Sequence, residues 1–183
     1  LAMNCSGKHA GMLATCVING WPIDSYLDPT HPLQLAIKAE VEQMSGEKVA
    51  GVSVDGCGAP LFLFSLLGLA RAIRHLTIST DAVHQEVAQA CRDYPEMVSG
   101  PGRLATRMMQ KIPGLFMKDG AEAVNVTSLA DGRTMAIKIS DGNARAMPAI
   151  TAAALAKFGI DAQEVPVNTL GAGLPVGTIR ATL

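Results

Sequence analysis

The chain has 183 residues, of which 49% are hydrophobic and 17% charged, and its formal net charge is −1. This length predicts one domain or two small ones, of which we take a single domain, residues 1–183, and the composition predicts a hydrophobic core and argues against a disordered chain. The low charge and the aromatic content of 4% argue against nucleic-acid binding, which requires clustered basic residues and stacking rings.

The first two thirds of the sequence predict mostly helices. Apolar residues recur there at helical spacing, and Gly20 and Gly46 stand where two of the helices are expected to end. The β-branched run Val49–Val54 predicts a short strand, and Asp55-Gly56-Cys57-Gly58 predicts a tight turn after it. In chain order the predicted helices are Lys8–Ile18, Pro32–Met44, an apolar helix from Pro60 to about His75, Ala82 to about Arg92 with Asp81 as its cap, and a short helix ending near Lys111.

The last third of the sequence predicts an antiparallel meander followed by one helix. Asp119-Gly120 and Asp131-Gly132 separate short apolar runs, which is a strong hairpin signal. Helices grouped on such a sheet predict an α+β fold, with an antiparallel sheet flanked by helices. The predicted elements are strands Leu115–Lys118, Ala123–Leu129 and Thr134–Ile139, a helix Ala144–Phe158 that Gly159 ends, and an edge strand Val176–Leu183.

The most reactive stretch is NCSGKHAGML, residues 4–13, which holds a thiol, a hydroxyl, an amine and an imidazole within five consecutive residues. Cys5 and Lys8 are three residues apart, so they share a face of the predicted helix and can act together. The alternative interpretation is that Cys5 is a small buried hydrophobe and Lys8 an incidental charge. A phosphate-binding loop is excluded, because no glycine lies five residues before Gly7 and His9 stands where that loop needs Ser or Thr.

Three further stretches carry candidate chemistry. Cys57 lies between two glycines just after a predicted strand, which exposes its sulfur, although a bland turn explains the pattern equally well. Lys138 leaves the end of an apolar strand, where it could hold a carboxylate or act with a nucleophile, or could simply be solvated. Ser45 and Lys48 form a Ser-x-x-Lys pattern, but Ser45 ends a predicted helix instead of opening one, so we discount the pair.

Taken together, NCSGKHAGML, DGCG, MVSGPGR, KDGAEA and KISDG closely resemble the bacterial thermolabile-type L-asparaginases of the asparaginase II family, the zinc-containing rhizobial-type class. The resemblance implies a fold similar to serine β-lactamases and glutaminases, the hydrolysis of asparagine to aspartate and ammonia, and a homodimer. It implies a zinc site with Cys5, Lys8 and Cys57 as ligands and Asp55 beside the metal-bound water. It also implies that Lys138 is the catalytic strand lysine near the nucleophilic serine. The irregularly spaced cysteines predict free thiols in a cytoplasmic protein.

The resemblance also implies a nucleophilic serine in a Ser-x-x-Lys motif upstream of NCSGKHAGML. We therefore expect the 183 residues to be the C-terminal part of an asparaginase-like protein, with a fold incomplete at the N-terminal side and no activity alone. Two alternatives remain open at this point. The chain could be a module that binds a metal or an amino acid without turnover, or a structural or dimerising fragment.

Overall fold

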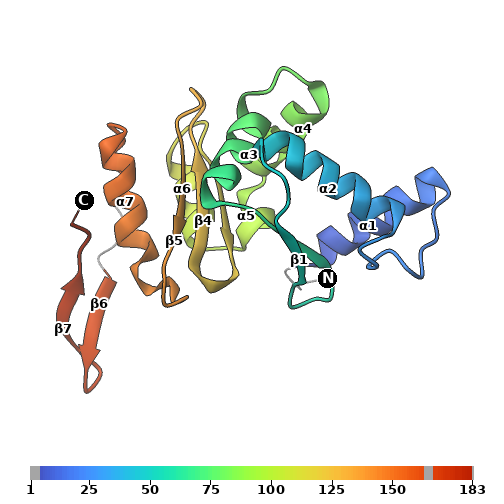
Figure 1. Ribbon diagram of the computed structural model, residues 1–183. Coiled ribbons are helices and arrows are strands. Elements are labelled where there is room, and N and C mark those ends of the chain that lie inside the picture. The colour runs from blue at the N-terminus through green and yellow to red at the C-terminus, as the bar shows by residue number, and fades with distance from the viewer. Residues whose placement is uncertain (1–4, 163–166, 183) are drawn as a thin grey trace. The chain divides into compact units, whose positions relative to one another are not determined.

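The computed structural model describes residues 5–162 and 167–182, and the chain divides into two compact units, residues 1–72 and 73–183 (Figure 1). The single domain stays a prediction. In the described residues α-helices combine with small antiparallel sheets, which confirms the α+β class. The similarity to serine β-lactamases also stays a prediction. No helix in this part of the chain has the length and apolar character needed to cross a membrane.

The first unit consists of two helices, a hairpin and the start of a third helix. Helix α1 (Ser6–Asn19) and helix α2 (Pro32–Ser45) both end at a glycine in the left-handed conformation, Gly20 and Gly46, with φ of 66° and 70°. Both helix ends were predicted from these glycines. By residue type Asn4 or Ser6 could cap α1, but Asn4 lies outside the described residues and Ser6 is the first residue of the helix. Cys5 takes the N-cap position, and its side chain makes no capping hydrogen bond.

The prediction of a helix beginning at Pro60 is wrong. Strand β1 (Gly51–Val54) pairs antiparallel with strand β2 (Pro60–Leu63), and helix α3 (Leu66–Ile78) begins only after them. A short apolar run fits a strand as well as a helix, and here pairing with β1 decides between them. Ser65 marks the true start of the helix, because its hydroxyl accepts a hydrogen bond from the backbone N–H of Gly68 at 2.9 Å.

A small core holds α1, α2 and the turn after β1 together. Its buried side chains are Met12, Cys16, Leu33 and Ala59, with Trp21, Tyr26, Leu27, Ile37 and Cys57 packed around them. The core therefore reaches from the first helix to the Asp55–Gly58 turn. It thus holds the first helical turn of α1 close to the loop formed by residues Asp55–Gly58.

The second unit contains the predicted meander and further helices. Helix α4 (Ala82–Asp93) is capped by Asp81 as predicted, and a short helix α5 (Pro95–Ser99) that was not predicted follows it. The three meander strands pair in the order β3-β4-β5, each antiparallel to its neighbour, so both predicted hairpins form. Asp131-Gly132 lies between its strands as predicted, whereas Asp119-Gly120 belongs to β3 and the first connection is Ala121–Ala123. The other elements are α6 (Leu104–Lys111), β3 (Phe116–Gly120), β4 (Val124–Ser128), β5 (Thr134–Lys138), α7 (Met147–Lys157), β6 (Val167–Gly171) and β7 (Leu174–Ile179).

The core of the second unit lies between the meander and the helices α6 and α7. Met108, Leu115 and Leu155 are each at most 1% exposed and fill its centre. On the helix α3 side, the Thr77 hydroxyl hydrogen-bonds to the Ser128 hydroxyl of β4 at 2.7 Å. The meander is thus fixed by apolar packing and by this buried polar contact.

Candidate active site

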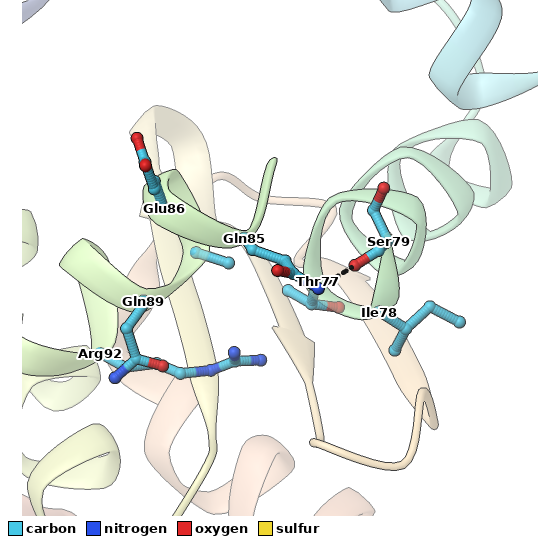
Figure 2. A pocket seen from close by; sticks show the side chains of 8 residues that line it. Thr77, Ile78, Ser79, Gln85, Glu86, Gln89 and Arg92 are labelled. Atoms are coloured by element: carbon cyan, nitrogen blue, oxygen red, sulfur yellow. Dashed lines mark hydrogen bonds between the residues drawn. The ribbon is translucent and has the colours of Figure 1, made fainter. Parts of the chain in front are cut away.

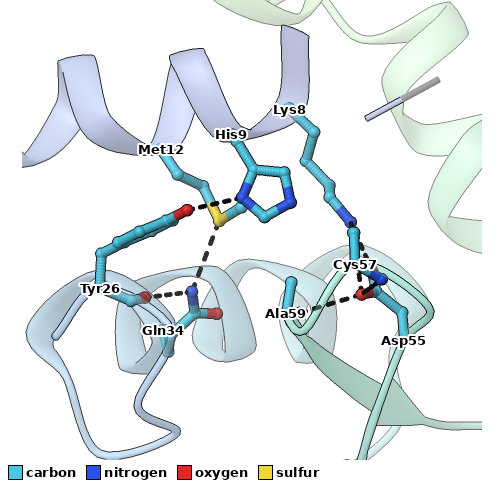
Figure 3. A network of polar contacts seen from close by, with 8 residues as sticks. All are labelled: Lys8, His9, Met12, Tyr26, Gln34, Asp55, Cys57 and Ala59. Atoms are coloured by element: carbon cyan, nitrogen blue, oxygen red, sulfur yellow. Dashed lines mark hydrogen bonds and ion pairs between the residues drawn. The ribbon is translucent and has the colours of Figure 1, made fainter. Parts of the chain in front are cut away.

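Lys8, Asp55 and Cys57 meet in the first unit, although 47 and 49 residues separate Lys8 from the other two. Lys8 lies in the first turn of α1, and its side chain extends toward the turn after β1 (Figure 3). Its ammonium donates a hydrogen bond to Asp55 Oδ2, and a second to Cys57 Sγ at 3.0 Å. The structure therefore brings together three of the four residues that the resemblance assigned to the metal site.

Asp55 organises the turn that presents Cys57. Its Oδ1 accepts hydrogen bonds from the backbone N–H of Cys57 at 3.0 Å and of Ala59 at 2.9 Å. The same oxygen accepts a hydrogen bond from the Cys57 thiol at 2.9 Å. The backbone N–H of Gly58 donates a hydrogen bond to the Asp55 carbonyl oxygen at 3.1 Å. Gly58 adopts a φ of +87°, which suits glycine best. The carboxylate thus fixes both the backbone of the turn and the direction of the sulfur.

The charges of this cluster support one another. Hydrogen bonds from Cys57 and Lys8 hold the pKa of the Asp55 carboxyl well below its usual range. Partial burial acts to lower the pKa of Lys8, but hydrogen bonds to Asp55 and Cys57 outweigh it and raise the pKa above the ordinary 10.5. The hydrogen bond to Asp55 raises the pKa of Cys57, against the opposite effect of Lys8. At neutral pH the cluster is a carboxylate, an ammonium and a thiol.

Cys5 belongs to the same neighbourhood as Lys8 and Cys57. A hydrogen bond between the Cys5 and Cys57 side chains contributes to the raised pKa of Cys57, and Cys5 also interacts electrostatically with Lys8. All four cysteines are free thiols, as predicted. Cys16 is fully buried in the core of the first unit, and Cys91 is half-buried in the second.

A second polar network, which the sequence did not predict, links α1 to Tyr26 and to α2. His9 Nδ1 and the Tyr26 hydroxyl are 2.7 Å apart, and the two rings meet edge to face. Gln34, which is 2% exposed, donates to the Tyr26 carbonyl at 2.7 Å and contacts Met12 Sδ at 3.5 Å (Figure 3). Only His9, the residue next to Lys8, hinted at this network in the sequence. The network fixes the rotation of α1 and hence the direction in which Lys8 points.

Lys138 lies in the second unit, at the end of β5, as predicted. Its ammonium donates to the carbonyl oxygens of Glu122 at 2.6 Å and of Ile139 at 2.7 Å. Glu122 and Ala123 both have positive φ, 56° and 55°, a strained conformation that is found preferentially at functional sites. The expectation that Lys138 shares a cleft with Cys5, Lys8 and Cys57 remains a prediction.

The Ser45–Lys48 pair is not arranged for catalysis, in agreement with its dismissal above. Ser45 is fully buried at the last position of α2, and its hydroxyl contacts only local backbone groups in the hydrogen bonds described. The Lys48 side chain is 90% exposed and donates to Glu42 Oε2 at 2.7 Å. Both side chains therefore make local contacts at the carboxyl-terminal end of α2.

Whether this cluster can hold a zinc ion depends on Lys8 acting as one of the ligands. Among the described residues no three His, Cys, Asp or Glu side chains are placed to hold a metal ion together. Two thiols, an amine and a carboxylate are nevertheless zinc donors, and tetrahedral zinc with bonds of ~2.0–2.3 Å separates its ligand atoms by about 3.5 Å. Cys57 Sγ and Lys8 Nζ are 3.0 Å apart, so a small outward shift would make room. The donor types suit zinc once Lys8 and the thiols lose their protons, but the described side chains are not assembled as a ligand set, so the zinc site stays a prediction.

Comparison with known proteins places the chain in a family. Its sequence matches the family model described as L-asparaginase II over residues 1–176. A comparison with curated proteins finds no match. Because the family match covers nearly all of the 183 residues, this chain belongs to the L-asparaginase II family.

Proposed function

We propose that the chain forms part of the active site of an amidohydrolase that converts L-asparagine to aspartate and ammonia, in the thermolabile, zinc-containing rhizobial-type class of its family. The observation that carries the proposal is the meeting of Lys8, Asp55 and Cys57 from distant segments of a chain that belongs to this family. A structural role alone would not require an amine, a carboxylate and a thiol in mutual contact at a partly exposed turn.

In this proposal Cys5, Lys8 and Cys57 hold a zinc ion and Asp55 orients the polar groups around it. Zinc, when bound, supplies a positive charge that polarises and positions the substrate's polar groups. Asp55 keeps the turn in shape with Cys57 and Ala59, so the thiolate points to one place with or without the ion. Its carboxylate also accepts hydrogen bonds from the side chains of Lys8 and Cys57, which orients both groups.

Lys138 is proposed to act beside the nucleophile. Amide hydrolysis by acyl transfer needs a hydroxyl whose proton is taken up by a nearby base. A neutral Lys138 amine would serve as that base, and the carbonyl of Glu122 at 2.6 Å fixes its position. The one Ser-x-x-Lys pattern within the 183 residues, Ser45–Lys48, is unsuitable. We propose that a serine outside these residues supplies the nucleophile, and that the 183-residue polypeptide alone does not hydrolyse asparagine.

The experiment is ammonia release from L-asparagine, with L-glutamine in parallel, by the full protein that carries this chain. Substituting Cys57→Ser or Lys138→Ala should each lower kcat/KM by at least about 100-fold, the effect expected when acid–base or positioning groups are removed. Cys91→Ser is the matched control for the thiol and should stay within about twofold. Turnover that survives both site substitutions would refute the proposal, and saturable asparagine binding without turnover would favour a binding module.

The remaining expectations about the protein are tested separately. We propose a cytoplasmic homodimer, whose mass in solution can be measured by light scattering. For the 183-residue polypeptide, ammonia release clearly above a blank would contradict the proposed need for an additional serine.

A further inference from the structure

A cavity in the second unit has no role in the proposed reaction. It has a volume of about 500 Å³ and lies between the end of α3 and helix α4 (Figure 2). Its lining residues are Thr77, Ile78, Ser79, Gln85, Glu86, Ala88, Gln89 and Arg92. This volume is within the range of pockets that bind small molecules, roughly 300–1,000 Å³.

The sequence of α4 explains why a cavity forms there. Gln85, Gln89 and Arg92 follow one another at spacings of four and three, so they lie on one face of the helix. Ala88 lies on the same face, is 1% exposed, and is too short to fill the space between the longer side chains. The face toward the cavity is therefore polar at its rim and open at its centre.

Arg92 extends from α4 toward the end of α3, where Thr77 and Ser79 lie (Figure 2). Its Nε and Nη2 atoms are shielded from solvent, and neither has a hydrogen-bond partner among the described residues. Burial lowers the pKa of this guanidinium. Arg92 as a whole is partly exposed, but polar atoms that are shielded from solvent are normally hydrogen-bonded, because an unpartnered one destabilises the fold.

The two unpartnered atoms are the ones that recognise oxyanions. Nε–H and Nη2–H lie on the same edge of the guanidinium plane and point in parallel, which matches the two oxygens of a carboxylate or phosphate. Other donors at the cavity are already engaged: Gln85 Nε2 donates to the Ser79 carbonyl at 3.2 Å, and Gln89 Nε2 donates to Asp93 Oδ1 at 2.6 Å. Glu86 lines the cavity but points away from Arg92 (Figure 2).

We propose that this cavity binds a small molecule through a carboxylate or phosphate group, which the guanidinium of Arg92, a residue that lines the cavity, holds in a bidentate contact once its side chain turns the shielded Nε and Nη2 donors toward the ligand. None of Lys8, Asp55, Cys57 and Lys138 is among the residues that line the cavity. The ligand is larger than a bare ion, because the cavity leaves space beyond the guanidinium.

The test is isothermal titration calorimetry of the protein with inorganic phosphate and, separately, with L-aspartate, at constant ionic strength set with sodium chloride. Saturable binding of at least one of the two is expected, and the anion that binds more tightly identifies the chemical source. Arg92→Gln should weaken binding at least tenfold, and Arg92→Lys, which keeps the charge but not the parallel donors, should weaken it severalfold. Arg145→Gln is the control: it removes an arginine that pairs with Asp141 at 2.7 Å, away from the cavity, and should leave binding unchanged.

Thermal unfolding of the same variants separates a binding role from a structural one. Without added anions, Arg92→Gln should unfold at the same or a higher temperature than the wild type, because it removes a partly buried cation whose two shielded nitrogens have no hydrogen-bond partner among the described residues. Three results would overturn the proposal: neither anion binds the wild type, Arg92→Gln binds as well as the wild type, or Arg92→Gln unfolds at a clearly lower temperature.

Discussion

Asp55→Asn tests whether this carboxylate, and not merely its shape, holds the turn before Cys57. The amide oxygen of asparagine can still accept the backbone N–H groups of Cys57 and Ala59, but the charge that attracts Lys8 is lost. A hydrogen bond to a charged group contributes about 1.5–3 kcal/mol, against about 1 kcal/mol for a neutral pair. The Asp55 and Lys8 side chains are 24% and 40% exposed, so solvent screening keeps their ion pair below about 1 kcal/mol. The expected loss in the free energy of unfolding is about 2 kcal/mol.

The assay is urea unfolding in the presence of a chelator, followed by tryptophan fluorescence. Trp21 is the single tryptophan and packs against the core of the first unit, so its signal reports on the unit that contains Asp55. Asp28→Asn is the matched control: Asp28 also accepts two hydrogen bonds in a local turn, from the backbone N–H and the hydroxyl of Thr30, each at 2.7 Å. It lies away from Lys8 on an exposed turn, so its loss should be clearly smaller.

The contribution of Asp55 to the free energy of unfolding should also depend on pH. The pKa of folded Asp55 is lowered, so its contribution is complete above the unfolded value of ~3.9 and is lost as the pH falls through the folded value. The stability difference between wild type and Asp55→Asn should stay constant from pH 7 to 5 and shrink below pH ~4. A difference no larger than that of Asp28→Asn, or one that persists unchanged into acid, would refute the reasoning.

Three further predictions concern the core, the discounted lysine and the metal. Leu155→Ala removes a fully buried side chain from the core of the second unit and should lower the free energy of unfolding by about 2–5 kcal/mol, measured by denaturation with circular dichroism. Lys48→Ala should leave asparagine hydrolysis by the full protein within about twofold, because Lys48 is exposed and pairs only with Glu42 in the ion pairs described; a large loss would reinstate the Ser45–Lys48 pair. Zinc affinity should fall as the pH is lowered from 8 to 6, because Lys8, whose pKa is raised, and Cys57 must lose protons to bind; an affinity independent of pH would argue against these ligands.

Local signals predicted much of the fold. Gly20 and Gly46 marked helix ends because the left-handed conformation there is easy only for glycine. Asp81 marked a helix start because its side chain accepts the backbone N–H groups of Val83 and His84. These features depend on a few neighbouring residues, so they can be read without knowing the rest of the structure.

Features set by distant residues could not be predicted in this way. The run from Pro60 is a strand because it pairs with β1, which no local propensity reveals. Strand β6 was missed because its hairpin turns at Ala172-Gly173, where Ala172 takes a φ of 50°, and alanine is not a typical residue for such a turn. The approach of Lys8 to Cys57 over 49 residues likewise came from family resemblance and not from spacing.

The spacing of residues along the sequence did not predict which side chains of the site contact one another. Cys5 and Lys8 were predicted to share a helix face, but Lys8 meets Asp55 and Cys57 because the core around Met12 fixes α1 on the turn. Asp55 contacts Lys8 and Cys57 directly, which spacing did not predict, and its place beside a metal-bound water stays a prediction. That hydrogen-bonding pattern depends on the turn's backbone, which the sequence indicated only through its glycines.

The most direct test of the central claim, that the cluster around Cys57 is a zinc site, is the zinc content of purified protein at neutral pH, measured by mass spectrometry for wild type, Cys57→Ser and Cys91→Ser. The account predicts about one zinc per chain in the wild type and in Cys91→Ser, since one tetrahedral site is proposed, and a large loss in Cys57→Ser. Equal zinc content in all three proteins would contradict it.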